Sequence, residues 1–191
     1  TNVLVVELAL PPDREWPTFH NDNEHRGMSP AVFQPPVDPM WTAGPYFASM
    51  FTGPVMKDGI VYTTTLDGYI RAHDAWTGEL IWANLVGGIY YTGTPTVENG
   101  IVYTTFYADP EKGYVCAFDA YTGARLWTVG PETGIDFNAR VSLEADAGLV
   151  FGAAWSGEVF ALDASTGDLV WSYNTGDYPY GAPTIAAGTV F

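Results

Sequence analysis

A pattern of eleven residues that occurs three times constrains this chain more than any other feature of its sequence. The pattern is Ala-x-Asp-Ala-x-Thr-Gly-x-x-x-Trp, and its copies read AHDAWTGELIW at 72–82, AFDAYTGARLW at 117–127 and ALDASTGDLVW at 161–171. The three tryptophans are 45 and 44 residues apart. A second shared pattern precedes each copy, and GAPTIAAGTVF at 181–191 begins a fourth occurrence of it. The chain is therefore an array of repeated units that bury a core by stacking on one another.

The period of the array identifies the kind of unit. A repeat of 44–45 residues is typical of a β-propeller blade, which is a sheet of four short strands. In the first unit we expect strands over 54–57, 60–66, 69–74 and 79–85, and two of the turns between them read Asp-Gly, a strong hairpin signal. The sequence contains 21 glycines and 14 prolines, as a turn-rich chain requires. We predict an all-β fold, a β-propeller of four-stranded antiparallel blades.

Each residue type in the repeated pattern has a structural role that its position predicts. The aspartate can accept hydrogen bonds from backbone N–H groups of the turn and from the threonine hydroxyl, and glycine suits a left-handed position. We expect the tryptophan to cover the joint between neighbouring blades and the first alanine to leave room for the indole. We interpret these residues as a structural blade motif: Ala72, Asp74, Thr77, Gly78, Trp82, Ala117, Asp119, Thr122, Gly123, Trp127, Ala161, Asp163, Thr166, Gly167 and Trp171.

At these residues the chain resembles the tryptophan-docking motif of quinoprotein-type propellers, the family of PQQ-like repeats. That group contains alcohol dehydrogenases that depend on pyrroloquinoline quinone (PQQ), and an exported, non-enzymatic branch that includes BamB of the outer-membrane assembly machinery. Residues 16–29, WPTFHNDNEHRGMS, are similar to the opening W-P-x-F-x-x-D-x-x-x-x-G-x-S of exported members. The resemblance covers residues 41–191. It implies an eight-bladed ring and an extracytoplasmic location, whether periplasmic, secreted or at the cell surface.

The length of the chain sets how much of such a ring it can supply. Eight blades need about 350 residues, so 191 residues are expected to form only three to four blades. We expect residues 1–15 to form an N-terminal strand or arm, and residues 16–51 a leading segment whose closing strand carries Trp41. Residues 52–191 then hold the blades, at 52–86, 93–129, 138–173 and, in part, 181–191. The remaining blades are expected from a longer polypeptide or from other protein subunits.

The apolar run VLVVELAL at 3–10 lies outside the repeats and is long enough for a buried strand. It allows three interpretations: the last strand of a preceding domain, an outer strand of the ring, or an arm donated to a neighbouring subunit by β-augmentation. The donated arm would join subunits into a homopolymer. We name as candidate interaction residues Val3, Val5, Leu8 and Leu10, together with four tyrosines that fall between predicted strands or near blade ends, Tyr90, Tyr91, Tyr178 and Tyr180. These tyrosines would either bind a partner or pack between blades.

Charge and cysteine content exclude several classes of function. The chain carries 22 acidic and 7 basic residues, a net charge of −15, which disfavours binding to nucleic acids and to anionic membranes. We predict no transmembrane segment, because no apolar run reaches 18 residues. The single cysteine, Cys116, excludes an intrachain disulfide and a cysteine-based zinc site, and we interpret it as a small buried residue.

A search of the sequence for catalytic chemistry finds little. If the resemblance extends to the quinoprotein dehydrogenases, it implies a site with PQQ, a Ca²⁺ or lanthanide ion held by Glu, Asn and Asp, and an Asp base. Several members of that group also have a disulfide between adjacent cysteines. No Cys-Cys pair is present, and no Glu, Asn and Asp triad can be assigned. His20 and His25 share one loop, but their spacing matches no standard metal site. We therefore predict no catalytic, cofactor-binding or metal-binding residue, and PQQ with Ca²⁺ enters only under an enzymatic alternative.

Three functions remain open at this point. The first is a non-catalytic, extracytoplasmic PQQ-like propeller that serves as a scaffold for protein interaction or assembly. The second is a structural subunit of a surface layer or filament, joined through the N-terminal strand. The third is a fragment of a PQQ-dependent dehydrogenase.

Overall fold

The structure is a computed structural model that describes residues 2–6, 17, 39–46, 52–87, 92–109, 112–135, 137, 142–177 and 181–191. These residues form antiparallel sheets and one short 3-10 helix, η1 (Pro131–Thr133). The predicted all-β propeller class is confirmed. Within the described residues, no helix is long and apolar enough to cross a membrane.

Three four-stranded sheets form the body of the molecule, and each is one blade. In each sheet the strands lie in chain order, and we call them A, B, C and D from first to last. The first blade is β3 (Val55–Lys57), β4 (Ile60–Thr64), β5 (Tyr69–Asp74) and β6 (Leu80–Leu85). The second is β7 (Thr96–Glu98), β8 (Ile101–Asp109), β9 (Lys112–Asp119) and β10 (Arg125–Val129). The third is β11 (Glu144–Asp146), β12 (Leu149–Ala153), β13 (Glu158–Asp163) and β14 (Leu169–Asn174).

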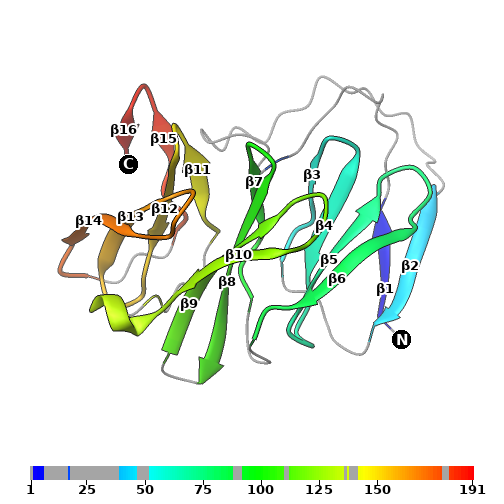
Figure 1. The fold of residues 1–191 in the computed structure, drawn as a ribbon, viewed down its shortest axis with the longest axis horizontal. Coiled ribbons are helices and arrows are strands. Elements are labelled where there is room, and N and C mark those ends of the chain that lie inside the picture. The colour runs from blue at the N-terminus through cyan, green and yellow to red at the C-terminus, as the bar shows by residue number, and fades with distance from the viewer. Residues whose placement is uncertain are drawn as a thin grey trace.

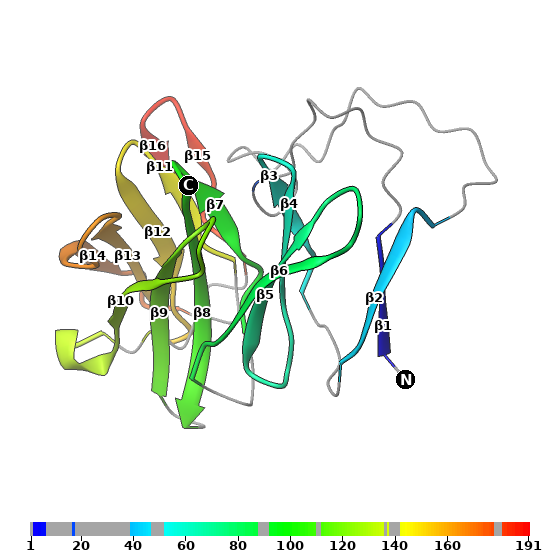
Figure 2. The same cartoon turned by 45° about the vertical axis from the view of Figure 1, so that its right-hand side comes forward.

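Two further sheets have only two strands each. One pairs β1 (Asn2–Val6) with β2 (Trp41–Tyr46), and the other pairs β15 (Ile185–Ala186) with β16 (Thr189–Val190). Figure 1 shows the three blades side by side, with β1–β2 beyond the first blade and β15–β16 beside the third. In the turned view of Figure 2, β1–β2 stays at the right and β15–β16 lies next to β11. Residues 3–6 of the N-terminal apolar run thus lie on a strand that has a partner in its own chain.

The strand boundaries differ from the expected ones where a turn takes residues from a strand. The second strand of the first blade was expected over 60–66, but β4 ends at Thr64. The backbone N–H of Gly68 donates to the carbonyl of Thr65, and the Thr65 hydroxyl donates to the Asp67 carboxylate. These bonds hold 65–68 as a turn, so Thr65 and Leu66 leave the ladder.

The core lies between the blades. One cluster of buried side chains joins the first and second blades and includes Tyr62, Trp82, Val102 and Phe118. A second cluster joins the second and third blades. The A strands also meet, because β7 contacts both β3 and β11. Each blade is therefore stabilised by its neighbours, as expected for a repeat protein.

The turn between strands A and B is the same in every unit. It holds a non-glycine residue with positive φ followed by a glycine with positive φ, as at Asp58-Gly59 (51° and 73°) and Asn99-Gly100 (49° and 75°). Two positive φ values in succession define the tight turn whose twist matches antiparallel strands. The third blade and the β15–β16 pair place alanine at the first position, at Ala147 and Ala187.

Candidate functional site

The residues of the repeated motif form a turn between strands C and D, and each aspartate organises it. In the first blade Asp74 Oδ1 accepts hydrogen bonds from the backbone N–H groups of Trp76 (2.9 Å) and Thr77 (2.8 Å), and from the Thr77 hydroxyl (3.0 Å). Asp119 makes the same three contacts in the second blade. In the third blade Asp163 Oδ1 accepts from two backbone N–H groups and from the Ser165 hydroxyl, while the Thr166 hydroxyl donates to Asp168 instead.

These hydrogen bonds favour the charged form of each aspartate. The pKa of Asp74 is lowered, first by the backbone N–H of Thr77. The pKa of Asp119 is lowered, first by the Thr122 hydroxyl, and that of Asp163, first by the Ser165 hydroxyl. A carboxylate that accepts several hydrogen bonds holds its proton less tightly. The three turns therefore carry full negative charge near neutral pH.

The tryptophan of each blade docks on the motif turn of the next blade. Trp82 Nε1 donates to the carbonyl of Ala120 at 2.9 Å, and Trp127 Nε1 donates to the carbonyl of Ala164 at 3.1 Å. Trp41, on β2, donates in the same way to the carbonyl of Ala75 at 2.8 Å. The acceptor is in each case the second alanine of the motif. One copy of the motif thus supplies the indole, and the next copy supplies the carbonyl that accepts its hydrogen bond.

The motif glycine makes room for the docked indole. Gly123 has φ +73°, and a Cβ built there would lie 2.6 Å from Cδ2 of Trp82. Gly78 stands in the same relation to Trp41, and Gly167 to Trp127. The first alanine of the motif lies opposite the tryptophan of its own blade, in the pairs Ala72–Trp82, Ala117–Trp127 and Ala161–Trp171. Only glycine meets both the backbone and the steric requirement at the socket.

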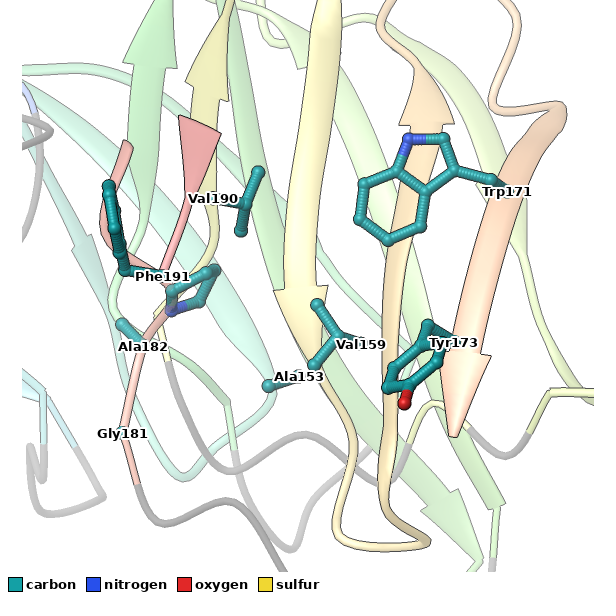
Figure 3. A pocket seen from close by; sticks show the side chains of 9 residues that line it. Ala153, Val159, Trp171, Tyr173, Gly181, Ala182, Val190 and Phe191 are labelled. Carbon is teal, nitrogen blue, oxygen red and sulfur yellow. The ribbon is translucent and has the colours of Figure 1, made fainter. Parts of the chain in front are cut away.

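Trp171 is the exception to this docking. Its side chain is 37% exposed, against 8% for Trp82. It lines an open hollow of about 390 Å³ with Tyr173, Val159 and Phe191, and Figure 3 shows these side chains around one space. The described residues place no motif turn against this indole. The third blade therefore presents an apolar surface where a following blade would dock.

The outer strand of each blade carries an exposed apolar residue immediately before the tryptophan. These residues are Ile81 (44% exposed), Leu126 (48%) and Val170 (52%). They form a row on β6, β10 and β14, which we call the rim row. Our sequence analysis did not name them as interaction residues. The signal was available, because the position before the tryptophan is apolar in all three repeats.

The buried titratable groups do not form a reactive cluster in the described part of the chain. Cys116 is fully buried, and burial raises the pKa of its thiol, so the reactive thiolate is disfavoured. Arg71 pairs with the Asp67 carboxylate at 2.6 Å and donates to the Thr65 hydroxyl. Among the described residues no group of three or more His, Cys, Asp or Glu is placed to hold a metal ion. A Ca²⁺ site built on these residues would have to include Asn or backbone oxygens among its ligands.

The candidate interaction residues fall mostly outside the described residues. Val3 and Val5 lie on β1, whose backbone pairs with β2, and Val5 is opposite Thr42. Leu8, Leu10, Tyr90, Tyr91, Tyr178 and Tyr180 lie outside the described residues, as do His20 and His25. The roles assigned to them stay predictions.

Comparisons with known proteins agree with this geometry. The family model PQQ_2, described as "Outer membrane protein assembly factor BamB", matches residues 31–191. The chain is 32% identical over 152 residues to "Alcohol dehydrogenase (quinone), dehydrogenase subunit" of Gluconacetobacter polyoxogenes, a match that covers 72% of this chain and 15% of that protein.

Solved structures show the same fold. BamB from Moraxella catarrhalis superimposes with a TM-score of 0.63 at 22% identity, over 81% of this chain and 48% of that one. The quinohemoprotein alcohol dehydrogenase from Comamonas testosteroni gives 0.63 at 22% identity, over 81% of this chain and 34% of that one. The match covers about half or less of the length of each of these three relatives. By its repeats and by the family match over residues 31–191, the chain belongs to the PQQ-like β-propeller repeat family described as outer membrane protein assembly factor BamB.

Proposed function

We propose that the protein is an extracytoplasmic scaffold, a PQQ-like propeller that binds other proteins or helps to assemble them. The family to which the chain belongs is described by an assembly role, which supports this function. The negative charge of −15 agrees with a partner other than a nucleic acid or an anionic membrane. The motif residues join neighbouring blades. The exposed side chains of the outer strands are therefore available for contact with a partner.

The rim row is the observation that carries the proposal. Ile81, Leu126 and Val170 repeat at one position per blade, and each is close to half exposed. Isolated exposed apolar residues are common, but a row repeated on successive outer strands presents an apolar surface of the kind that partners cover. Among the strands that the structure describes, each outer strand also has one edge without a neighbour in its sheet. An unpaired edge can accept an extended segment of a partner by β-augmentation.

Photo-crosslinking in the native cells tests this proposal. A photoreactive amino acid at Leu126 should give a discrete adduct with a partner protein, and the same amino acid at Ile81 should give the same adduct. Placed at Glu79, which is exposed and lies between the motif turn and β6, it should give none. A variant with serine at Ile81, Leu126 and Val170 should bind less of the partner and keep its melting temperature. Equal crosslinking at Glu79 and at the rim row would contradict the proposal.

The location is part of the proposal and has its own test. The exported relatives share the opening pattern at 16–29, and the acidic composition agrees with export. Fractionation of the native cells with antibodies to this protein should place it outside the cytoplasm. Recovery with a cytoplasmic marker would remove this part of the proposal.

A dehydrogenase is the second candidate, because the chain is 32% identical over 152 residues to the dehydrogenase subunit of a quinone alcohol dehydrogenase. PQQ, when bound to such an enzyme, accepts the electrons of the substrate. No cluster of three or more His, Cys, Asp or Glu lies within the described residues, so the metal ligands of such an enzyme would include Asn or backbone oxygens, or come from elsewhere in the protein. The native protein, supplied with PQQ and Ca²⁺, should then show the absorbance of bound quinone and reduce a dye in the presence of ethanol. The scaffold proposal expects neither signal.

A further inference from the structure

A pocket of about 320 Å³ lies between the second and third blades, at the place that we call the second joint. Strands β7 and β11, one from each blade, lie side by side there, as Figure 1 shows. Ile101, Tyr103 and Leu149 give the pocket apolar walls. Its volume is at the lower end of the range of about 300–1,000 Å³ that is usual for ligand pockets. The pocket therefore suits a single side chain or a small molecule.

Three carboxylates line the same pocket. Glu98 is the last residue of β7, Asp146 the last of β11 and Asp163 the last of β13. The Ser165 hydroxyl and backbone N–H groups of the turn lower the pKa of Asp163, so this carboxylate is charged near neutral pH. Apolar walls beside carboxylates favour a cation that carries an apolar body, since the body can pack while the charged end meets the acids.

The first joint, between the first and second blades, has a lysine and a tyrosine at the equivalent positions. Lys57 ends β3 as Glu98 ends β7. Tyr121 follows the second alanine of the motif, where the third blade has Ser165. The first joint thus contains a cation and an aromatic side chain of its own. The second joint has a carboxylate and a small hydroxyl in their places.

Tyr121 covers the first joint. Its hydroxyl donates to the Asp58 carboxylate of the preceding blade at 2.8 Å. A Cβ built at Gly100 would lie 3.3 Å from the Tyr121 ring. At Gly148, the equivalent glycine of the third blade, no atom of the structure lies within 4 Å of such a Cβ. The serine in place of tyrosine therefore leaves the second joint open.

The surface around the pocket is acidic as well. The A–B turn and the C–D turn lie at the same end of each blade, because the second alanine of the motif donates its backbone N–H to the A–B turn. Ala120 donates to the carbonyl of Gly100 at 2.9 Å, and Ala164 to that of Gly148 at 3.0 Å. Asp119, in the C–D turn of the second blade, adds a further negative charge at this end. Such a surface attracts a basic segment toward the pocket.

We propose that the second joint binds a lysine side chain that a partner protein presents in a basic, extended segment. The ε-ammonium lies among Glu98, Asp146 and Asp163. The stem lies against Tyr103 and Leu149. A compact ammonium suits carboxylates from three different strands, whereas the planar guanidinium of arginine is best matched by one carboxylate in a bidentate pair. The lysine that the first joint carries at the equivalent position supports the same choice.

This inference rests on the proposed function in one respect only, that the ligand belongs to a protein. The residues that line the pocket are separate from the rim row. The two surfaces can therefore be tested independently.

Titration calorimetry with a capped Lys-Ala-Lys-Ala-Lys peptide tests the site. The protein should bind the peptide, and binding should weaken as salt is added. Ser165→Tyr places at the second joint the residue that covers the first, and it leaves the net charge unchanged. It should abolish binding and keep the melting temperature. Absence of binding to the unchanged protein, or full binding to Ser165→Tyr, would overturn the proposal.

A pair of charge variants separates the pocket from general attraction. Glu98→Lys gives the second joint a lysine of its own, as at the first joint, and should weaken binding about tenfold or more. Glu79→Lys makes the same change of charge at an exposed residue of the first blade and should weaken binding much less. Equal weakening by the two variants would show that only the overall charge attracts the peptide, and would overturn the pocket.

Spermidine tests the source of the ammonium group. It carries the same charge as the capped peptide but has no peptide backbone to contact the surface around the pocket. It should bind no more tightly than the peptide does. Tighter binding of spermidine would identify a free polyamine as the ligand and would overturn the assignment to a partner protein.

The rim-row variant keeps this test apart from that of the proposed function. With serine at Ile81, Leu126 and Val170, the protein should still bind the peptide as the unchanged protein does, because none of these residues lines the pocket. Absence of peptide binding together with discrete crosslinks at the rim row would remove the lysine site alone. Peptide binding without such crosslinks would remove the rim row and leave the lysine site.

Discussion

The indole N–H of Trp82 donates a 2.9 Å hydrogen bond to the carbonyl of Ala120, a residue 38 positions later and in the next blade. The hydroxyl of Tyr62 donates to the same carbonyl at 3.1 Å. One backbone oxygen of the second blade thus holds two aromatic side chains of the first. The joint between blades combines apolar packing with hydrogen bonds that are shielded from water, which makes both sensitive to substitution.

Trp82→Ala should reduce the free energy of unfolding by about 3–5 kcal/mol, the usual effect of truncating a buried aromatic side chain. Trp82→Phe keeps a ring but leaves the Ala120 carbonyl with one donor fewer, and should reduce it by less. Trp171→Ala should have a distinctly smaller effect, because this indole is 37% exposed. Urea denaturation of the three variants checks this order. Equal losses for Trp82→Ala and Trp171→Ala would contradict the docking account.

Gly123→Ala should be more destabilising than Gly59→Ala, although both glycines have φ +73°. At Gly59 nothing lies within 4 Å of the added Cβ, so only backbone strain of about 1 kcal/mol is expected. At Gly123 the Cβ would lie 2.6 Å from the Trp82 ring, and overpacking should add about 1–3 kcal/mol. The matched φ values separate the two effects in one denaturation experiment. Similar losses of stability at both positions would show that the Trp82 ring can move to accept the added Cβ without an energetic penalty.

His73 should make the protein less stable in mild acid. Burial, and next the nearby charge of Arg71, lower its pKa from 6.5 to about 4. Below pH 6.5 the unfolded chain therefore binds a proton that the folded chain does not. The free energy of unfolding should fall as the pH drops from about 6.5 to about 4, by on the order of 3 kcal/mol at most.

His73→Phe is the matched variant, because Phe118 holds this position in the second blade. Denaturation of both proteins between about pH 6.5 and pH 4 should show a fall in the free energy of unfolding for the original chain only. Further loss below about pH 4 should persist in both, because the lowered pKa values of Asp74, Asp119 and Asp163 stabilise the fold only while these groups are charged. An unchanged slope in His73→Phe would remove His73 as the cause.

Ala147→Asn should stabilise the third blade. Ala147 has φ +50° at the first position of its turn, where the second blade has Asn99 with φ +49°. Asparagine tolerates this conformation better than alanine does, so a gain of roughly 0.5–1 kcal/mol is expected. The reciprocal Asn99→Ala should lose a similar amount. Melting temperatures of both variants check the prediction, and a loss in Ala147→Asn would contradict it.

The repeated motif made the blades predictable, because each strand, turn and tryptophan recurs with one period. Asp-Gly at 58–59 was enough to place the turn between β3 and β4, although β4 ends two residues earlier than expected. The exposure of Ile81 and Leu126 was not predicted, because strand alternation places them on the face opposite the tryptophan but does not show whether another element covers that face.

Trp41, Trp82 and Trp127 each enter a socket made by the same motif one repeat later, so these three joints share one indole hydrogen bond and one contact with glycine. A repeat can therefore be duplicated, removed or exchanged by recombination without a new interface having to evolve, provided that the exchange keeps the motif in phase. Trp82 would fit the turn around Ala164 as it fits the turn around Ala120. Evolution can therefore change the number of blades in such a protein while the contact between neighbouring blades is preserved.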